Sequence, residues 1–327
     1  MKSQEEIMNS RPDFTTIPDG WFPEKLLEGN RVRWVYLGTE AFTEPFFTDT
    51  VSARLHFEPN QNRREAVCSV DEFLKLAKQA DAVEPSAFIF HISRCGSTLL
   101  SQLLSRDERC IVLSEVPFLD QVLRFPFPKD DAGIALRQKF FRAALHLLGR
   151  NVNGKQKFLF IKTDSWHIMF FDLIRQMYPH VPVVLLYRSP AEVMRSQDKL
   201  KGMHAVPGVI EPELFGFDPE TVQDMMQAAY LGRVLERYFE EYLRILESDS
   251  RAYPINYHDG VMEMVKRVAE ISQVRFDDVT LAGMQERAGT HAKFPEQVFA
   301  RETTLPEQHG KPGELFNRLK QMSADIG

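Results

Sequence analysis

Residues 86–104, SAFIFHISRCGSTLLSQLL, carry the side chains best suited to binding a phosphate or a similar anion. Arg94, Gly96, Ser97 and Thr98 come shortly after a buried-type apolar run. A strand, a tight loop and a helix start, in this order, aim backbone N–H groups and the helix dipole at one anion. The pattern departs from the nucleotide loop G-x-x-x-x-G-K-[ST], because the Lys is missing and Arg94 precedes the glycine. The sequence therefore predicts an anion site here, and not an ordinary ATPase loop.

Two further apolar runs end in cationic residues. Lys162 ends FLFIK, and Arg188 ends VPVVLLYR, with Ser196 eight positions later. Ligands of an open parallel sheet bind at the carboxyl ends of its strands, so these side chains are expected near the loop. Arginine suits such a site, because its fork of N–H donors matches phosphate geometry.

The elements that must position these residues alternate between strand and helix patterns after Glu84-Pro85. Apolar strands are expected at 88–90, 110–115, 158–162 and 181–188, with helices between them, such as 97–104, 135–149 and 220–247. Buried apolar strands separated by helices are typical of a parallel sheet with helices on its faces. The prediction is an α/β domain over residues 84–327.

Residues 1–83 are predicted to form a small, strand-rich extension with one helix at 69–80. Aromatic and alternating residues in 21–57 favour a few antiparallel strands, separated by turns at Gly29-Asn30 and Glu44-Pro45. Within the main domain, 117–134 and 203–217 are expected to be loops. The segment from Ala282 onward is expected to be mostly irregular.

Composition excludes several classes of function. The chain has 327 residues, 43% of them hydrophobic, and a net charge of −6, which argues against broad nucleic-acid binding. Three cysteines without a CxxC pair argue against a disulfide framework or a zinc site. No signal-type core and no run of ~20 apolar residues is present, so a cytoplasmic protein without a membrane span is expected.

Three segments resemble the sulfotransferase family. HISRCGSTLL is similar to that family's 5′-phosphosulfate loop, often written PRSGTTLL. LLYRSPAEVMRSQ resembles its 3′-phosphate segment, in which an Arg and a Ser lie eight positions apart, as Arg188 and Ser196 do. PINYHDG resembles its late strand and turn. The resemblance extends from about Ser86 to Thr304 and is closer to the Arg-loop branch than to the cytosolic branch.

This resemblance implies a P-loop NTPase-like three-layer sandwich. It implies an enzyme that transfers a sulfuryl group from 3′-phosphoadenosine 5′-phosphosulfate to a hydroxyl or amine by in-line displacement. Arg94 and Lys162 would stabilise the leaving diphosphate, and Arg188 and Ser196 would bind the 3′-phosphate. The 5′-phosphate would be held by the backbone of the loop residues Cys95, Gly96, Ser97, Thr98 and Leu99. No metal is expected, because no acidic residue ends the VPVVLLYR strand.

The general base implied by the resemblance is Glu115, which follows the second strand as in some branches of the family. The cytosolic branch has a His directly after a Lys-Thr pair, but Asp164 stands there in this chain, and His167 lies one turn further on. Asp164 and His167 therefore stay open as alternatives. Thr290 and His291 are a weaker suggestion for the same site.

Two other functions remain open from the sequence. One is an ATP-dependent small-molecule kinase or nucleotide hydrolase on the same fold, and the other is a non-catalytic nucleotide-binding module. The acceptor is expected to be a small molecule of unspecified identity, and a homodimer is compatible with the sequence. His91 is expected to be a satisfied strand-end histidine, and Cys95 a small loop residue instead of a nucleophile.

Overall fold

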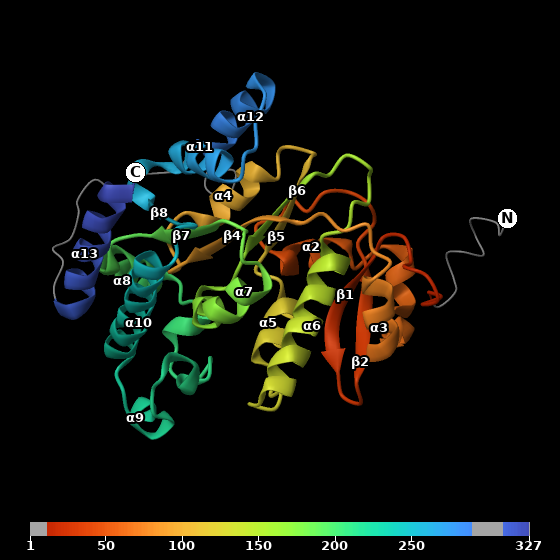
Figure 1. Cartoon of the computed structure of the whole chain (residues 1–327), viewed down its shortest axis with the longest axis horizontal. Coiled ribbons are helices and arrows are strands. Elements are labelled where there is room, and N and C mark those ends of the chain that lie inside the picture. Colours follow the sequence, from red (N-terminus) through yellow and green to blue (C-terminus); the bar gives the residue numbers. More distant parts are fainter. Residues whose placement is uncertain (1–11, 290–309, 327) are drawn as a thin grey trace. The chain divides into compact units, whose positions relative to one another are not determined.

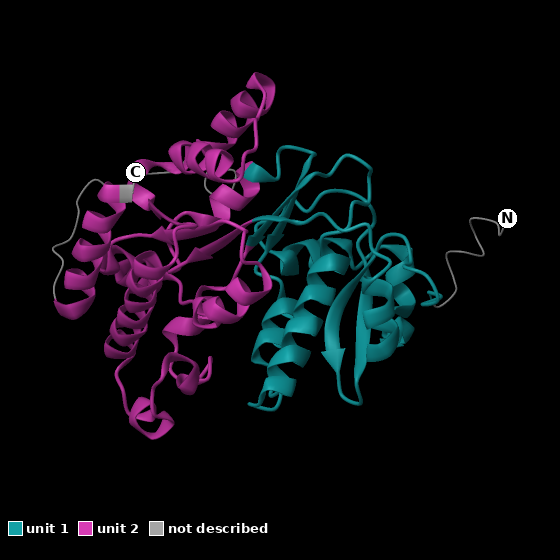
Figure 2. Cartoon of the chain, viewed as in Figure 1, with its two compact units in different colours: residues 1–86, 104–161 teal, residues 87–103, 162–327 magenta. Residues whose placement is uncertain are grey.

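The computed structural model describes residues 12–289 and 310–326. The chain divides into two compact units, coloured separately in Figure 2. Unit 1 comprises residues 1–86 and 104–161, and unit 2 comprises residues 87–103 and 162–327. The boundary expected at 83/84 stays a prediction about domain organisation.

The main elements of unit 1 are five helices, counting the 3₁₀ helix η1, and five strands, and all are short except one helix. They are β1 (Trp21–Leu27), β2 (Arg31–Tyr36), α2 (Phe47–Arg54), the 3₁₀ helix η1 (Glu58–Glu65), β3 (Val67–Ser69), α3 (Val70–Ala77), β5 (Cys110–Ser114), α5 (Pro117–Arg124), α6 (Asp131–Leu148) and β6 (Phe158–Lys162). Lys162, the last residue of β6, already belongs to unit 2.

Unit 2 begins with the strand and helix on either side of the predicted anion loop. Its elements are β4 (Pro85–His91), α4 (Ser97–Leu104), η2 (Ser165–Phe170), α7 (Phe171–Met177), β7 (Val183–Tyr187), α8 (Pro190–Lys199), η3 (Met203–Ala205), η4 (Pro212–Phe215), α9 (Pro219–Gln223), α10 (Gln227–Ser248), β8 (Ala252–Asn256), η5 (Tyr257–Asp259), α11 (Val261–Ile271), α12 (Asp278–Ala288) and α13 (Gly310–Ile326).

The central sheet has the strand order β5-β6-β4-β7-β8. β4 pairs with β7, and β7 with β8, both in parallel. All five residues of β7 are buried, as expected for a strand covered on both faces. The predicted α/β fold with a parallel central sheet is confirmed.

Helices cover both faces of the unit 2 strands. Figure 1 shows α4, α11 and α12 above these strands and α7, α8 and α10 below them. α10 buries one stripe of large residues, including Tyr230, Tyr238 and Tyr242, at the spacing of an amphipathic helix. The loop that follows β4 therefore starts from strands held on both sides by apolar packing.

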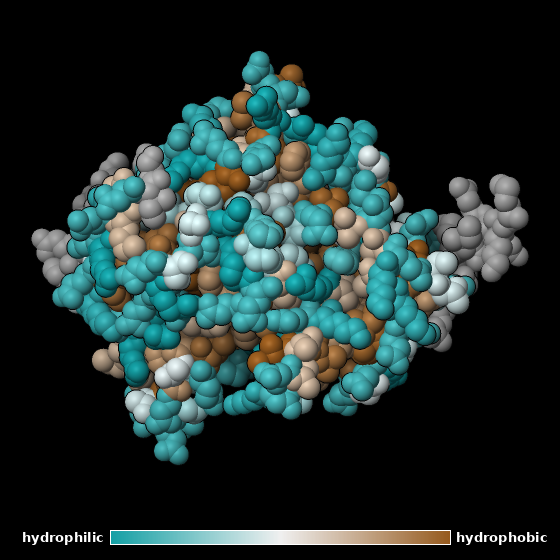
Figure 3. Space-filling model, in the orientation of Figure 1, coloured by the Kyte–Doolittle hydropathy of each residue, from teal (hydrophilic) through white to brown (hydrophobic). Residues whose placement is uncertain are grey.

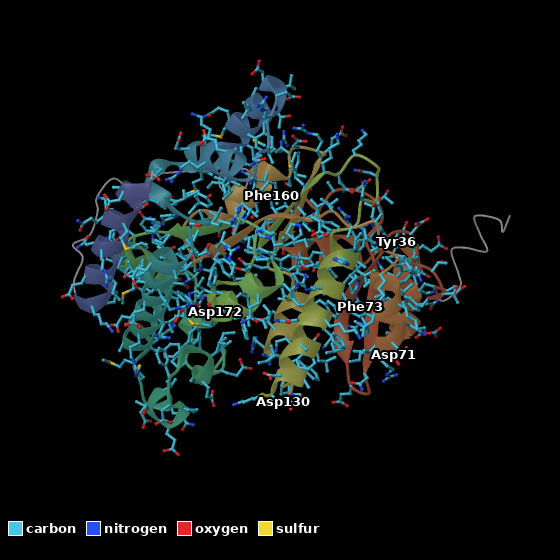
Figure 4. All side chains as sticks on the ribbon, viewed as in Figure 1. Tyr36, Asp71, Phe73, Asp130, Phe160 and Asp172 are labelled. Carbon is cyan, nitrogen blue, oxygen red and sulfur yellow. The ribbon has the colours of Figure 1, made fainter. Side chains whose placement is uncertain are left out.

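Unit 1 contains a separate antiparallel sheet of β1, β2 and β3. The helix predicted at 69–80 is confirmed as α3, which Ser69 opens by accepting a hydrogen bond from the Glu72 backbone. Phe73 of α3, labelled in Figure 4, packs its ring against Phe118 of α5 and Phe140 of α6. These aromatic contacts form the core on which the small sheet rests.

The expectation of strands between residues 42 and 57 is wrong, because residues 47–54 form the helix α2. The buried side chain of Arg54 donates to the backbone carbonyls of Leu37, Glu40 and Ala41. These long-range hydrogen bonds fix the connection from β2 into α2. Local alternation of aromatic and polar residues carries no information about them.

Two other expectations are corrected. Residues 117–134 are not a loop, since α5 occupies 117–124 and α6 begins at Asp131. The chain after Ala282 is not mostly irregular, because α12 continues to Ala288 and α13 spans 310–326. Pro117 occupies the first position of α5, where proline is a common helix-start signal. The helix is short, so its apolar spacing alone did not identify it. By contrast, 203–217 contains only two short 3₁₀ turns, as expected of a loop.

Hydrophilic residues cover most of the molecular face shown in Figure 3, and apolar residues appear in smaller areas between them. None of the helices in the described ranges combines the length and the apolar content required to cross a bilayer.

Replacing Arg54 with Met is expected to lower the free energy of unfolding by about 3 kcal/mol, because three carbonyls lose a charged donor. Chemical denaturation monitored by circular dichroism measures the change. Arg64→Met, at an exposed position of η1, is the matched control and should change stability by less than about 0.5 kcal/mol. Equal effects of the two substitutions would show that Arg54 does not anchor this connection.

Candidate functional site

The anion loop, residues 92–96, connects β4 to α4 through an unusual backbone. Ser93 and Arg94 have positive φ angles of 69° and 53°, and Gly96 has 80°. Backbone turns of this kind can direct successive N–H groups toward one side of the chain and form a concave anion site. The loop leads directly into α4, whose N-terminus adds its dipole.

Gly96 is required at its position for two reasons. Its φ of +80° strains any side chain, and a Cβ there would lie 3.1 Å from Cδ2 of Tyr257. Tyr257 belongs to η5, directly after β8. The glycine therefore lets the loop pack against the end of a strand that follows much later in the chain.

His91 fixes the start of the loop. Its Nδ1 accepts the backbone N–H of Ser93 at 3.1 Å, so Nε2 carries the hydrogen and donates to the carbonyl of Thr163 at 2.9 Å. Both ring nitrogens are engaged, and the side chain is buried. This confirms the expectation of a satisfied strand-end histidine.

Lys162 places a positive charge beside the first turn of α4. It ends β6 with only 1% of its surface exposed, and its ammonium donates to Oγ1 of Thr98 at 3.5 Å. Coulomb attraction is stronger in such a poorly solvated place than at the surface. An anion held by the loop would therefore gain from this buried cation.

Arg188 reaches the same loop from the end of β7. Its Nη1 donates to the carbonyl of Arg94 at 3.1 Å, and its guanidinium lies 4.2 Å from the ring centroid of Tyr257. A cation over an aromatic face is attracted by the ring quadrupole. The predicted 3′-phosphate residue and the predicted 5′-phosphate loop are thus brought together within unit 2.

Glu192 and His258 form a hydrogen-bonded chain behind Arg188. Nη2 of Arg188 donates to Oε1 of Glu192 at 2.9 Å, and Nε2 of His258 donates to Oε2 at 2.7 Å. Burial alone would raise the pKa of Glu192, but the hydrogen bonds from Arg188 and His258 outweigh it and lower the pKa below its usual value. Glu192 is therefore an ionised carboxylate at neutral pH.

No family model matches the chain, and no curated protein matches it. The chain is similar to solved sulfotransferases. One from Mycobacterium avium is 14% identical, with 76% of this chain and 77% of that chain covered and a TM-score of 0.45. The sulfotransferase domain of the curacin biosynthetic pathway is 16% identical, with 73% and 99% covered and a TM-score of 0.45. A mouse sulfotransferase complexed with PAP is 13% identical, with 74% and 76% covered and a TM-score of 0.37.

The remaining predicted donor-site residues lie on or near α4 and α8. The guanidinium of Arg94 donates to the carbonyl of Leu200, which follows α8. Ser97 and Leu99 are buried in α4. Ser196 is half-buried on α8, where its carbonyl accepts the N–H of Leu200. Their roles in binding a donor stay predictions.

Cys95 is fully buried in the anion loop. Burial raises the pKa of its thiol to about 12, although backbone hydrogen bonds at Ile92 and Ser97, and less strongly the charges of Lys162 and Arg188, oppose this shift. A thiol that stays protonated at neutral pH is a poor nucleophile. The geometry agrees with a packing role for its side chain and leaves its backbone to the anion site.

Glu115 belongs to unit 1, where it directly follows β5. Its φ is +50°, a left-handed conformation, and its side chain is half-buried. Such backbone strain costs about 1–3 kcal/mol and is concentrated at functional positions. Within the described part of the chain, only five residues other than glycine have positive φ, and Glu115, Ser93 and Arg94 are three of them.

The two alternative bases lie in a single turn of unit 2. Asp164 precedes η2, and its backbone N–H donates to Nδ1 of His167 at 3.2 Å. Nε2 of His167 then carries the hydrogen and lies 3.6 Å from Oδ2 of Asp164. The two side chains are therefore coupled within one turn, and both stay alternatives to Glu115. Thr290 and His291 lie outside the described residues.

Two residues of this site were not identified from the sequence. Glu192 lies four positions after Arg188, a spacing that often pairs opposite charges at a helix start. His258 is separated from Glu192 by 66 positions, so only the parallel pairing of β7 with β8 brings them together.

Gly96→Ala is expected to destabilise unit 2 more than Gly208→Ala does. Both positions have positive φ, at 80° and 77°, but a Cβ at Gly208 has nothing within 4 Å. Each change therefore costs about 1–2 kcal/mol from backbone strain, and Gly96→Ala adds roughly 1–2 kcal/mol from the contact with Tyr257. Thermal melts of both variants test this, and a Gly208→Ala loss as large as that of Gly96→Ala would rule out the close contact.

Proposed function

We propose that this protein is a sulfotransferase that uses 3′-phosphoadenosine 5′-phosphosulfate as its donor. The observation that carries the proposal lies within unit 2: Arg188 contacts the strained anion loop, and Lys162 contacts the first turn of the helix that the loop leads into. A donor with two separate anionic ends needs two cationic positions. The resemblance of HISRCGSTLL and LLYRSPAEVMRSQ to sulfotransferase segments supports the same assignment.

The chain offers groups of the right chemistry for each end of this donor. Backbone N–H groups of Cys95 to Leu99, with the α4 dipole, would hold the 5′-phosphate. Arg188, with Ser196 on α8, would bind the 3′-phosphate, the group that distinguishes this donor from ATP. The hydrogen bonds of Arg188 to the Arg94 carbonyl and to Glu192 fix the orientation of its guanidinium.

The bound donor supplies the sulfuryl group, and the acceptor supplies an oxygen or nitrogen nucleophile. In the transfer, the bond from sulfur to the phosphate oxygen breaks while a bond from sulfur to the acceptor forms. Lys162 would stabilise the negative charge that grows on the leaving diphosphate, because it is buried beside Thr98 in a fixed position. Arg94 is proposed for the same charge. Fixed charges of this kind need no reorganisation during the reaction.

Glu115 is the proposed general base that accepts the acceptor's proton. Its left-handed backbone supports this choice. Asp164 and His167, which share one turn, remain the alternatives. The proposed acceptor is a small molecule, and the 203–217 segment is proposed to contribute to its selection.

The first test is the binding of 3′,5′-diphosphoadenosine, 5′-AMP and ATP, measured by calorimetry. The 3′,5′-diphosphate is expected to bind most tightly, because only it can engage both cationic positions. Arg188→Ala should weaken its binding by about 10- to 100-fold, and should weaken 5′-AMP binding less, because 5′-AMP loses only the support that Arg188 gives to the loop backbone.

Arg251→Ala is the control for this test, since Arg251 is exposed at the amino end of β8. It should leave all three affinities unchanged. Tighter binding of ATP than of the 3′,5′-diphosphate would contradict the proposed donor and favour a kinase or hydrolase.

A second test separates Glu115 from Asp164. Transfer of a labelled sulfuryl group from the donor to a panel of phenols, alcohols and amines gives the rate. Glu115→Gln should lower kcat by about 10²- to 10⁴-fold and leave donor binding intact. Asp164→Asn should lower it by less than about tenfold. The reverse order would assign the base to Asp164.

A further inference from the structure

The charges around Arg188 present a physical problem for anion recognition. Arg188 is paired with Glu192, and this carboxylate is only 1% exposed. The pair has no net charge, so it attracts a phosphate dianion far less than an isolated guanidinium would. If Glu192 left the pair, Arg188 would become a poorly solvated cation without its counter-ion, which is energetically costly.

His258 can change this balance. Its Nε2 already donates to the second oxygen of Glu192, so its Nδ1 is the atom that would take up a proton. Histidine is the side chain that ordinarily changes charge between pH 5 and 8. With Nδ1 protonated, the chain of Arg188, Glu192 and His258 has a net charge of +1.

We propose that His258 is a further donor-site residue, which takes up a proton when the 3′-phosphate binds and so restores the positive charge of the Arg188–Glu192 pair. This inference rests on the proposed donor. His258 acts through Glu192 and is a positioning residue, not a catalytic one. A bound dianion favours the protonated imidazolium, and the imidazolium favours the dianion by the same factor.

His258 has charged neighbours on the β7–α8 segment and on its own element. Glu192 and Arg188 face it from the β7–α8 segment, and they cancel each other. Asp259, the next residue on η5, accepts the Asn256 backbone N–H and lies 3.8 Å from Arg267 of α11. That pair is also neutral. The side chain of His258 is 27% exposed, so a proton can reach it from solvent.

The proposal sets the direction of the pH dependence. A proton held more tightly in the complex than in the free protein adds to affinity at low pH, and this gain is lost as the pH rises. Affinity for 3′,5′-diphosphoadenosine should therefore fall as the pH rises from about 6.5 to 8.5. The fall in the wild-type protein should exceed that in His258→Gln by a factor of roughly five to ten. The ligand's own phosphates also titrate, with a second pKa of about 6. This contribution is the same for both proteins, so it cancels when the two pH dependences are compared.

Calorimetry in buffers of different ionisation enthalpy measures proton uptake directly. Wild-type protein is expected to take up roughly 0.3–1 proton more than His258→Gln on binding 3′,5′-diphosphoadenosine at about pH 7.5. The difference should shrink with 5′-AMP, which lacks the 3′-phosphate. His180→Gln is the matched control, because His180 is exposed at the amino end of β7, and it should behave as wild type.

The outcomes distinguish this inference from the proposed function. If wild-type protein does not prefer 3′,5′-diphosphoadenosine to 5′-AMP and ATP, the proposed donor fails. If it shows that preference but takes up no more protons than His258→Gln, the donor stands and the role of His258 is overturned. If His258→Gln does not fold, proton uptake by the wild-type protein decides. Uptake is then compared between 3′,5′-diphosphoadenosine and 5′-AMP, after each ligand's own titration is subtracted. Equal uptake with the two ligands overturns the inference.

Discussion

The guanidinium of Arg188 donates to the carbonyl of Arg94 in the anion loop and to the carboxylate of Glu192 on α8, and its flat face lies over Tyr257. One side chain thus connects the end of β7, the loop after β4 and the turn after β8. Arginine can do this because its donors point in fixed directions and its face binds aromatic rings. Lysine in its place would keep the charge and lose this geometry.

The loop that Arg188 supports is strained before any ligand arrives. Left-handed Ser93 and Arg94 each cost about 1–2 kcal/mol in a typical protein. His91 and Arg188 offset part of this strain by hydrogen bonds to the loop backbone. Because these hydrogen bonds already fix the loop backbone, it loses little conformational entropy when an anion binds, and this favours tight binding. The strain is therefore consistent with a functional role.

How well the sequence predicts this structure depends on how far apart in the chain the interacting residues lie. Strands such as 181–188 and the helix 69–80 follow from local apolar spacing and a Ser69 cap, and both are found. Helix α2 was missed because the side chain of Arg54 secures it through distant carbonyls. The anion loop was found from its own residues, whereas the partnership of Glu192 with His258 depends on strand pairing that no local pattern contains.

The pairing of Phe88 with Val183 has a consequence for synthesis on the ribosome. The loop after β4 is translated long before the strand that must lie beside it. At 5–20 residues per second, that strand follows after roughly 5–20 s. During this interval the apolar residues of β4 have no β7 neighbour and are open to chaperones or to aggregation. The anion site is therefore among the last parts of the nascent chain to form, even though its sequence begins in the first third.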